Sequence, residues 1–258
     1  TWFQKLIYSK KLLEQKKIAH GFYNSRGGKS DGIYKSLNCG IGSKDKKNNV
    51  KNNLKIVKNK ISKKSKNIYL VHQNHSNKFV FIGKNFKFKK KRIKADAIIT
   101  DQEKLPIAVL TADCAPLLIH DKKKNMIAVI HAGWRGAFKG IIQKVITFML
   151  RKGCENKNII VALGPCISQV NYNVGENFKK KFIKKAKKNK IFFKEKYNMI
   201  YFDLPKYIKS QLKSIKIDNI DMINIDTFEK RNNYFSARRS LRLKHDDYGR
   251  NISIIMIN

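Results

Sequence analysis

The chain has 258 residues, of which 42% are hydrophobic, and this length and composition exclude a generally disordered protein. Its 57 lysines and arginines against 18 acidic residues give a formal net charge of +39, and only nine of the basic residues are arginines. Because nucleic-acid readers rely on the planar fork of arginine, the lysine excess favours a compositional bias over selected nucleic-acid binding. We therefore expect no specific nucleic-acid partner.

The four cysteines are widely spaced and include no Cys-x-x-Cys pair, which is typical of free thiols in a reducing compartment. No apolar run is long enough to cross a membrane, and the first residues lack the pattern of a signal peptide. These features predict a cytoplasmic protein with no membrane partner. Lysine-rich surfaces disfavour tight self-association, so we expect a monomer or a weak homo-oligomer.

Apolar and partly β-branched runs predict the strands of the first half. In chain order these runs cover residues 68–71, 78–82, 97–100, 105–112, 116–120 and 126–132. The turn-like segment 121–125 is short enough for a hairpin, so the two strands that flank it are expected to pair antiparallel.

The hydrophobic period then changes from two to three and four residues. Apolar residues from Phe138 to Leu150 predict one helix, and Gly153 stands where a glycine commonly ends a helix. Further segments predict a strand at 159–163, helices at 178–186 and 204–215, and a last strand at 252–257. We expect an α+β fold: a single domain over residues 1–258, built as a layered α/β sandwich with mixed, largely antiparallel sheets and outer helices.

Three residues with metal-binding chemistry, His75, Cys114 and His131, lie at or near the ends of predicted strands. Two imidazoles and a thiolate suit zinc, and three protein ligands leave a fourth position for water or substrate. His72 is a less favoured ligand, because residues three apart on a strand point to opposite faces. Two alternatives stay open: ordinary core residues, or a metal-free site with Cys114 as nucleophile and His131 as its base.

An ordered set of short motifs surrounds these three residues. The motifs are Gln-Asn-His-Ser at 73–76, Ala-Asp-Ala-Ile-Ile-Thr at 95–100, Thr-Ala-Asp-Cys-Ala-Pro at 111–116, His-Ala-Gly-Trp-Arg-Gly at 131–136 and Leu-Gly-Pro-Cys-Ile-Ser at 163–168. From about His20 to Arg250, the chain resembles the bacterial polyphenol-oxidase/laccase-domain family, also called the peptidoglycan editing factor or purine nucleoside phosphorylase family.

The resemblance implies a zinc-dependent purine nucleoside phosphorylase that acts on adenosine, inosine and methylthioadenosine with phosphate, and has an accompanying adenosine deaminase activity. The family's metal ligands fall on His75, Cys114 and His131, so the implied cofactor is zinc, with copper possible. The older family label implies a copper-dependent polyphenol oxidase. Six histidines without any His-x-His pair argue against a multicopper centre.

Arginines are the natural candidates to hold the phosphate. Arg135 follows His131 at a turn where a helix is expected to begin, so we count it with Cys114 and His131 as catalytic. Arg26 and Arg239 are weaker candidates for the same contact.

Asn38, Asp113 and Trp134 complete the expected substrate-binding set. For Asp113 two roles stay open, orienting a metal ligand or capping a turn. For Trp134 the roles are stacking on a base or packing. Two departures from the family pattern, Asp226 in place of a cysteine and Ala237 in place of a tyrosine, fall on the expected C-terminal wall of the pocket.

Overall fold

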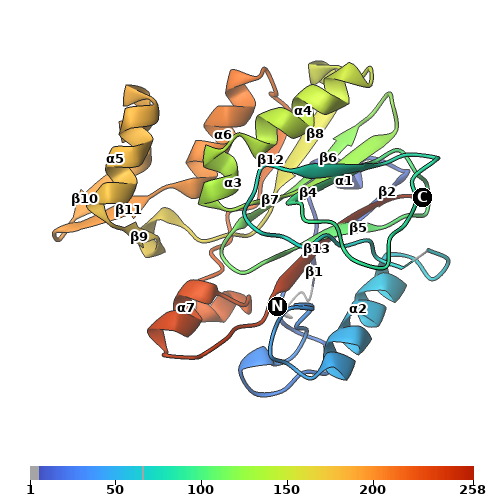
Figure 1. Ribbon diagram of the computed structural model, residues 1–258, viewed down its shortest axis with the longest axis horizontal. Helices are drawn as coiled ribbons and strands as arrows, with labels where there is room; N and C mark the ends of the chain where they lie inside the picture. Colours follow the sequence, from blue (N-terminus) through green and yellow to red (C-terminus); the bar gives the residue numbers. More distant parts are fainter. Residues whose placement is uncertain (1–5, 66) are drawn as a thin grey trace.

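Two β-sheets form the centre of the computed structural model, which describes residues 6–65 and 67–258 (Figure 1). The six-stranded sheet has the order β12 (Ile220–Met222), β8 (Ile159–Leu163), β6 (Ala115–Asp121), β7 (Met126–Ala132), β4 (Ala97–Thr100) and β3 (Phe79–Ile82). The four-stranded sheet has the order β1 (Leu6–Ile7), β2 (Ile18–Tyr23), β13 (Asn251–Ile257) and β5 (Ile107–Thr111). Only the two outermost pairs of the larger sheet, β3 with β4 and β8 with β12, are parallel.

The two sheets pack face to face, and helices cover their outer faces. Leu118 of β6 and Ile255 of β13 belong to the buried cluster between the sheets, whereas Leu117 and Ile119 of β6 face a second cluster on the other side. This second cluster includes residues of α4 (Ile141–Arg151) and α6 (Leu204–Ser214). Because the side chains of β6 alternate between two apolar layers, its sequence is an almost continuous apolar run.

The outer face of the four-stranded sheet packs against α2 (Lys47–Ile61), whose Val57 is fully buried. The result is four layers in the order helix, sheet, sheet, helix (Figure 1). This arrangement confirms the expected α+β class, with largely antiparallel sheets and outer helices.

A small third sheet extends from one side of this sandwich (Figure 1). It has the order β10 (Phe193–Lys196), β11 (Met199–Phe202) and β9 (Asn173–Val174), and aromatic residues of α5 (Glu176–Lys185) pack against it. The remaining short elements are α1 (Lys10–Leu13), α3 (Trp134–Phe138) and α7 (Ala237–Arg242), with 3-10 turns at Gly32–Tyr34, Asn156–Asn158, Gln169–Asn171, Lys187–Phe192 and Lys230–Asn232. No helix among the described residues is long and apolar enough to cross a membrane.

Two of the expected elements were wrong. Residues 68–71 do not form a strand: Tyr69 makes only an isolated bridge to Ile107, because the segment contacts the edge strand β5 at a single point. The expected single helix through residue 150 is two helices, α3 and α4, since Gly140 between them adopts a left-handed conformation with φ 82°. The antiparallel hairpin of β6 and β7 is confirmed, and so is the left-handed glycine, Gly153, that ends α4.

Candidate metal centre

Three side chains meet where the chain passes from one sheet to the other. Cys114 lies in the connection from β5 to β6, His131 lies near the end of β7, and His75 lies in the loop before β3. The pairing of Pro116 with His131 brings Cys114 beside the end of β7. The candidate ligand atoms of the three residues lie within 4.8 Å of one another, with Cys114 Sγ 3.9 Å from His75 Nε2. No other group of this kind occurs among the described residues.

Gly133 makes this close approach possible. A Cβ atom at this position would lie 2.7 Å from Cys114 Sγ and 3.1 Å from His75 Cδ2. The first distance is shorter than real Cβ contacts and the second is tight, so any larger residue would displace the thiol and crowd the imidazole. The glycine of the His-Ala-Gly-Trp-Arg-Gly motif is therefore part of the site.

Asp96 is hydrogen-bonded to two of the three residues, His75 and His131. Its side chain is fully buried, and Oδ1 accepts a hydrogen bond of 2.8 Å from His131 Nδ1. The same carboxylate accepts hydrogen bonds from the backbone N–H groups of Asn74, His75 and Ser76 and from the Ser76 hydroxyl. Because Nδ1 of His131 is held in this way, its Nε2 is the nitrogen left to bind a metal.

The electrostatics favour the metal-binding form of the thiol. Burial alone would raise the pKa of Cys114, but the charge and hydrogen bonding of His131, aided by His75, lower it to about 6. Burial opposes the charged form of His131 as well, yet Cys114 and Asp96 raise its pKa to about 9. The pKa of Asp96 is lowered to about 2, since its hydrogen bonds to His131 and Ser76 outweigh burial. The thiolate is the form of cysteine that binds metals.

The cluster opens into a cavity of about 270 Å³. Besides the three candidate ligands, its lining includes Gln73, Arg92, Tyr248 and Arg250 and the two loop glycines Gly40 and Gly42. This volume is near the lower end of the range for small-molecule sites.

The structure places Arg135 and Trp134 outside this lining. Arg135 is exposed on α3, with its guanidinium 5.2 Å from the centre of the Trp134 ring. Trp134 packs edge-on against Phe178 of α5, at 4.8 Å between ring centres, which agrees with a packing role.

Arg239 and Asp113 do not line the cavity, and their hydrogen bonds fasten the C-terminal segment. The Arg239 guanidinium donates to the backbone carbonyls of Thr227, Phe228 and Tyr234, so its hydrogen bonds are used within the protein. Asp113 accepts from the Thr227 hydroxyl at 2.8 Å and from a backbone N–H of α7 at 2.6 Å. Burial raises the pKa of Asp113 above its usual value. Both residues therefore have structural partners.

The two departures from the family pattern lie in the same region. Asp226 accepts hydrogen bonds from the Ser168 hydroxyl and from Asn171 Nδ2, so it ties together the loop that follows β8. Ala237 is the first residue of α7.

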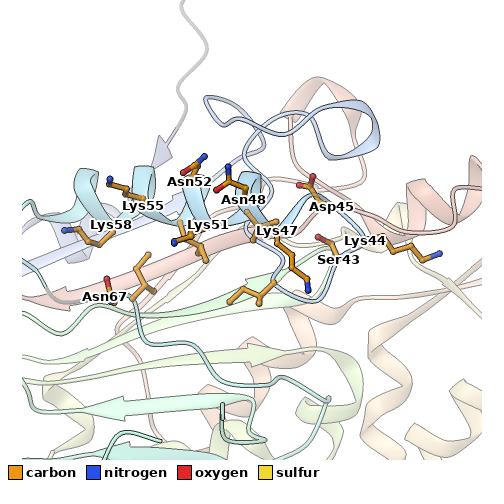
Figure 2. A pocket seen from close by; sticks show the side chains of 14 residues that line it. Ser43, Lys44, Asp45, Lys47, Asn48, Lys51, Asn52, Lys55, Lys58 and Asn67 are labelled. Atoms are coloured by element: carbon orange, nitrogen blue, oxygen red, sulfur yellow. The ribbon is translucent and has the colours of Figure 1, made fainter. Parts of the chain in front are cut away.

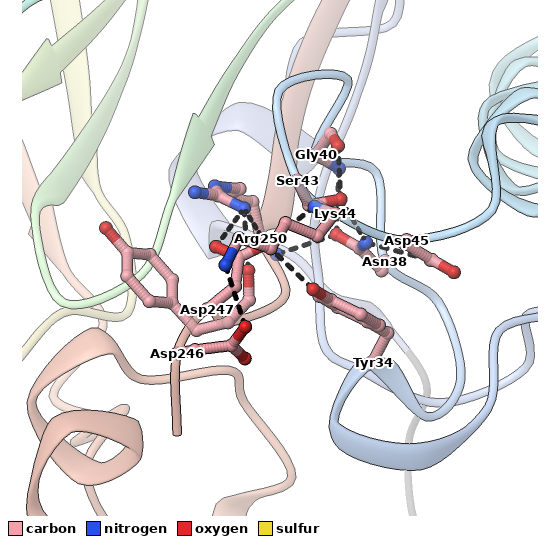
Figure 3. Close-up of polar contacts among 10 residues, drawn as sticks. Tyr34, Asn38, Gly40, Ser43, Lys44, Asp45, Asp246, Asp247 and Arg250 are labelled. Carbon is pink, nitrogen blue, oxygen red and sulfur yellow. Dashed lines mark hydrogen bonds and ion pairs between the residues drawn. The ribbon is translucent and has the colours of Figure 1, made fainter. Parts of the chain in front are cut away.

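Asn38 organises a loop at the mouth of the cavity (Figure 3). It is fully buried; its Nδ2 donates to Ser43 Oγ and Asp45 Oδ2, and its Oδ1 accepts from the backbone N–H groups of Gly40 and Arg250, all at 2.9 Å. Arg26 is half-buried, and its backbone N–H donates to Asn24 Oδ1. Neither Asn38 nor Arg26 lines the cavity.

A larger groove of about 930 Å³ runs along α2 on the other side of this loop (Figure 2). Its lining includes five lysines, which are Lys44, Lys47, Lys51, Lys55 and Lys58. The described residues that line this groove include no histidine, cysteine or arginine, whereas all three candidate metal ligands line the smaller cavity.

The protein is thus a sandwich of two sheets with a His-Cys-His cluster at their junction. This combination defines a protein with a candidate metal-dependent active site. The model of the family described as "Multi-copper polyphenol oxidoreductase laccase" matches residues 19–258, and the chain belongs to this family. The membership confirms the resemblance inferred from the motifs.

Several relatives carry the name purine nucleoside phosphorylase. The protein of that name from Rickettsia conorii is 36% identical over 213 residues, which are 80% of this chain and 86% of the relative. The one from Bacteroides thetaiotaomicron is 28% identical over 266 residues, or 99% and 97% of the two chains.

Solved structures share the fold. A Neisseria meningitidis protein superposes with a TM-score of 0.86 at 25% identity, covering 99% of this chain and 100% of its own. The Bacillus licheniformis hypothetical protein YfiH gives a TM-score of 0.85 at 25% identity, covering 95% and 94%.

Proposed function

We propose that the protein is a metal-dependent purine nucleoside phosphorylase. The observation that carries this proposal is the cluster of His75, Cys114 and His131 in a ligand-sized cavity, in a chain whose relatives are named for that activity. The proposed substrates are adenosine, inosine and methylthioadenosine together with phosphate. In the reaction, a phosphate oxygen bonds to the anomeric carbon of the sugar while the glycosidic bond breaks. The electron pair of that bond leaves with the base, which takes up a proton.

The proposed cofactor is one zinc ion held by His75, Cys114 and His131. The donor set fits, because it combines two imidazoles with a thiol whose pKa is already lowered. Zinc held by these three residues would supply a Lewis acid to the site. The same donors also accept copper, so metal analysis has to decide between them.

The protein's own residues prepare the site for this chemistry. Asp96 holds the His75 loop and the His131 ring in fixed orientations through its hydrogen bonds. Gly133 leaves the space in which the thiol and the imidazole approach each other. We also propose an adenosine deaminase side activity, in which water adds at C6 of adenine and ammonia leaves.

The direct test incubates the purified protein with inosine and phosphate and measures hypoxanthine and ribose-1-phosphate. We expect both products in equal amounts, only with phosphate present, together with about one zinc ion per chain by elemental analysis. Cys114→Ala should lose both the metal and the activity. Cys154→Ala, which removes a buried thiol outside the cavity, should retain both. Absence of both products from the zinc-loaded protein would contradict the proposal.

One observation favours a second candidate, a metal-free cysteine hydrolase: the lowered pKa of Cys114 beside His131 is also what a nucleophilic thiolate needs. This enzyme would keep its activity after zinc is removed by a chelator and would lose it on alkylation of Cys114. A copper-dependent polyphenol oxidase would instead consume oxygen with a phenol.

A further inference from the structure

Arginine side chains commonly bind phosphate, and the structure shows which arginines lie at the cavity beside the metal cluster. Arg239 donates to three backbone carbonyls, and Arg135 does not line the cavity. Two arginines do line the cavity of the His-Cys-His cluster, Arg92 and Arg250. Of these two, only Arg250 has side-chain hydrogen bonds among the described residues, so its guanidinium is the one held in place. We propose that Arg250 binds the phosphate co-substrate; this inference rests on the phosphorylase activity proposed above.

The Arg250 side chain is held firmly on one side. Its Nη1 donates to the backbone carbonyl of Tyr248 at 2.7 Å and pairs with Asp247 Oδ1 at 3.2 Å. The guanidinium lies 4.5 Å from the centre of the Tyr248 ring, and only 22% of the side chain is exposed. A fixed guanidinium loses little conformational entropy when it binds an anion.

The rest of the guanidinium remains available. Within the part of the chain that the structure describes, Arg250 Nε and Nη2 make no hydrogen bond. These N–H groups match the geometry in which arginine binds two phosphate oxygens. The Asp247 carboxylate has other partners besides this guanidinium. It also accepts hydrogen bonds from the Tyr34 hydroxyl at 2.8 Å and from the backbone N–H of Lys44 at 2.7 Å.

The neighbouring loop is built around this arginine (Figure 3). Asn38 Oδ1 accepts hydrogen bonds from the backbone N–H groups of both Gly40 and Arg250. A Cβ on Gly40 would lie 2.4 Å from Arg250 Cδ, so the loop backbone packs directly on the arginine stem. The guanidinium is thus positioned at the cavity before any ligand arrives, as binding of a small anion requires.

The test measures KM for phosphate and KM for inosine separately. Arg250→Gln should raise KM for phosphate about 10- to 100-fold, as expected for the loss of charge-assisted hydrogen bonds, and should change KM for inosine much less. Arg250→Lys keeps the charge without the fork, so its KM for phosphate should lie between those of the wild type and Arg250→Gln. The matched control is Arg151→Gln, an exposed arginine on α4, which should leave both constants unchanged.

Asp247→Asn separates phosphate binding from a structural role, because it removes the ion-pair partner and keeps the guanidinium. We expect its KM for phosphate to stay within a few-fold of the wild-type value. A rise equal to that of Arg250→Gln would mean that Arg250 acts only by holding the loop, and would overturn the inference.

Binding of inorganic phosphate, measured by calorimetry, tests the inference even if the protein shows no phosphorolysis. Lack of product in the wild type would refute the proposed function alone. Equal phosphate binding by the wild type and a folded Arg250→Gln variant would refute the role of Arg250.

Discussion

At the scale of single residues, Asp96 determines the geometry of the candidate metal centre. It is hydrogen-bonded to two of the three proposed ligands, although it does not itself line the cavity. A carboxylate of this kind fixes the tautomer of a metal-binding histidine and raises the basicity of the ring.

We predict that Asp96→Asn lowers zinc affinity about 10- to 100-fold, the usual effect of losing such a partner. Competition against a chromophoric chelator measures this affinity. Asp101→Asn, an exposed aspartate after β4, is the matched control and should bind zinc like the wild type. Wild-type affinity in a folded Asp96→Asn protein would mean that the hydrogen bond to His131 does not support the metal.

His20 is a second residue with a measurable consequence. It is 2% exposed, its Nε2 accepts a hydrogen bond from the Ser9 backbone N–H, and burial lowers its pKa from 6.5 to about 4. The folded protein therefore favours the neutral form of His20, and this preference contributes to its stability. This contribution to stability is complete above pH 6.5 and is lost as the pH falls from 6.5 toward 4, because the unfolded chain then binds the proton more readily.

We predict that, between pH 7 and pH 5, the free energy of unfolding falls by about 2 kcal/mol more in the wild type than in His20→Gln. Urea denaturation at the two pH values measures the difference. His245→Gln, at a half-exposed loop position, should behave like the wild type. Identical losses in wild type and His20→Gln would show that His20 is not held neutral.

At the scale of elements, α3 and α4 are separate helices because the chain turns at Gly140 between them. Gly140 adopts φ 82°, where a residue with a side chain is strained, and it precedes the first residue of α4. The helical periodicity of the sequence continues through this segment, because apolar residues on both sides of the break face the same cluster. The periodicity therefore predicted a single helix.

We predict that Gly140→Ala lowers the free energy of unfolding by about 1–2 kcal/mol, the cost of a left-handed alanine. Thermal or urea denaturation measures this loss. Gly175→Ala is the control, because Gly175 precedes α5 with φ −83° and has no atom near the added methyl group. If the two variants were equally stable, the claim that position 140 requires a left-handed backbone conformation would be wrong.

At the scale of the whole molecule, the net charge of +39 acts on a charged substrate and not on a neutral one. A positive surface raises the encounter rate of an anion, and added salt screens this attraction. We predict that kcat/KM for phosphate falls several-fold as potassium chloride increases from about 20 to 300 mM, a range in which the Debye length shortens severalfold. The corresponding value for uncharged inosine should change little. A salt-independent value for phosphate would show that the charge has no part in substrate capture.

Much of the fold could be predicted from local patterns. Alternation and apolar runs mark most strands of the two sheets, and the short segment 121–125 predicts the β6–β7 hairpin. Residues 68–71 show the limit of this reasoning: they have the composition of a strand, but strand formation also needs a partner along its length, and only Tyr69 finds one.

The sequence by itself determined the α+β class, the family and the His-Cys-His set, because these depend on residue types and spacings that are visible along the chain. Only the tertiary structure decided which arginines line the cavity. Arg135 is adjacent to the motif in sequence but exposed on α3, whereas Arg250 arrives from the far end of the chain through the pairing of β13 with β5. The position of a side chain relative to a cavity depends on contacts between distant segments, and such contacts leave no local pattern.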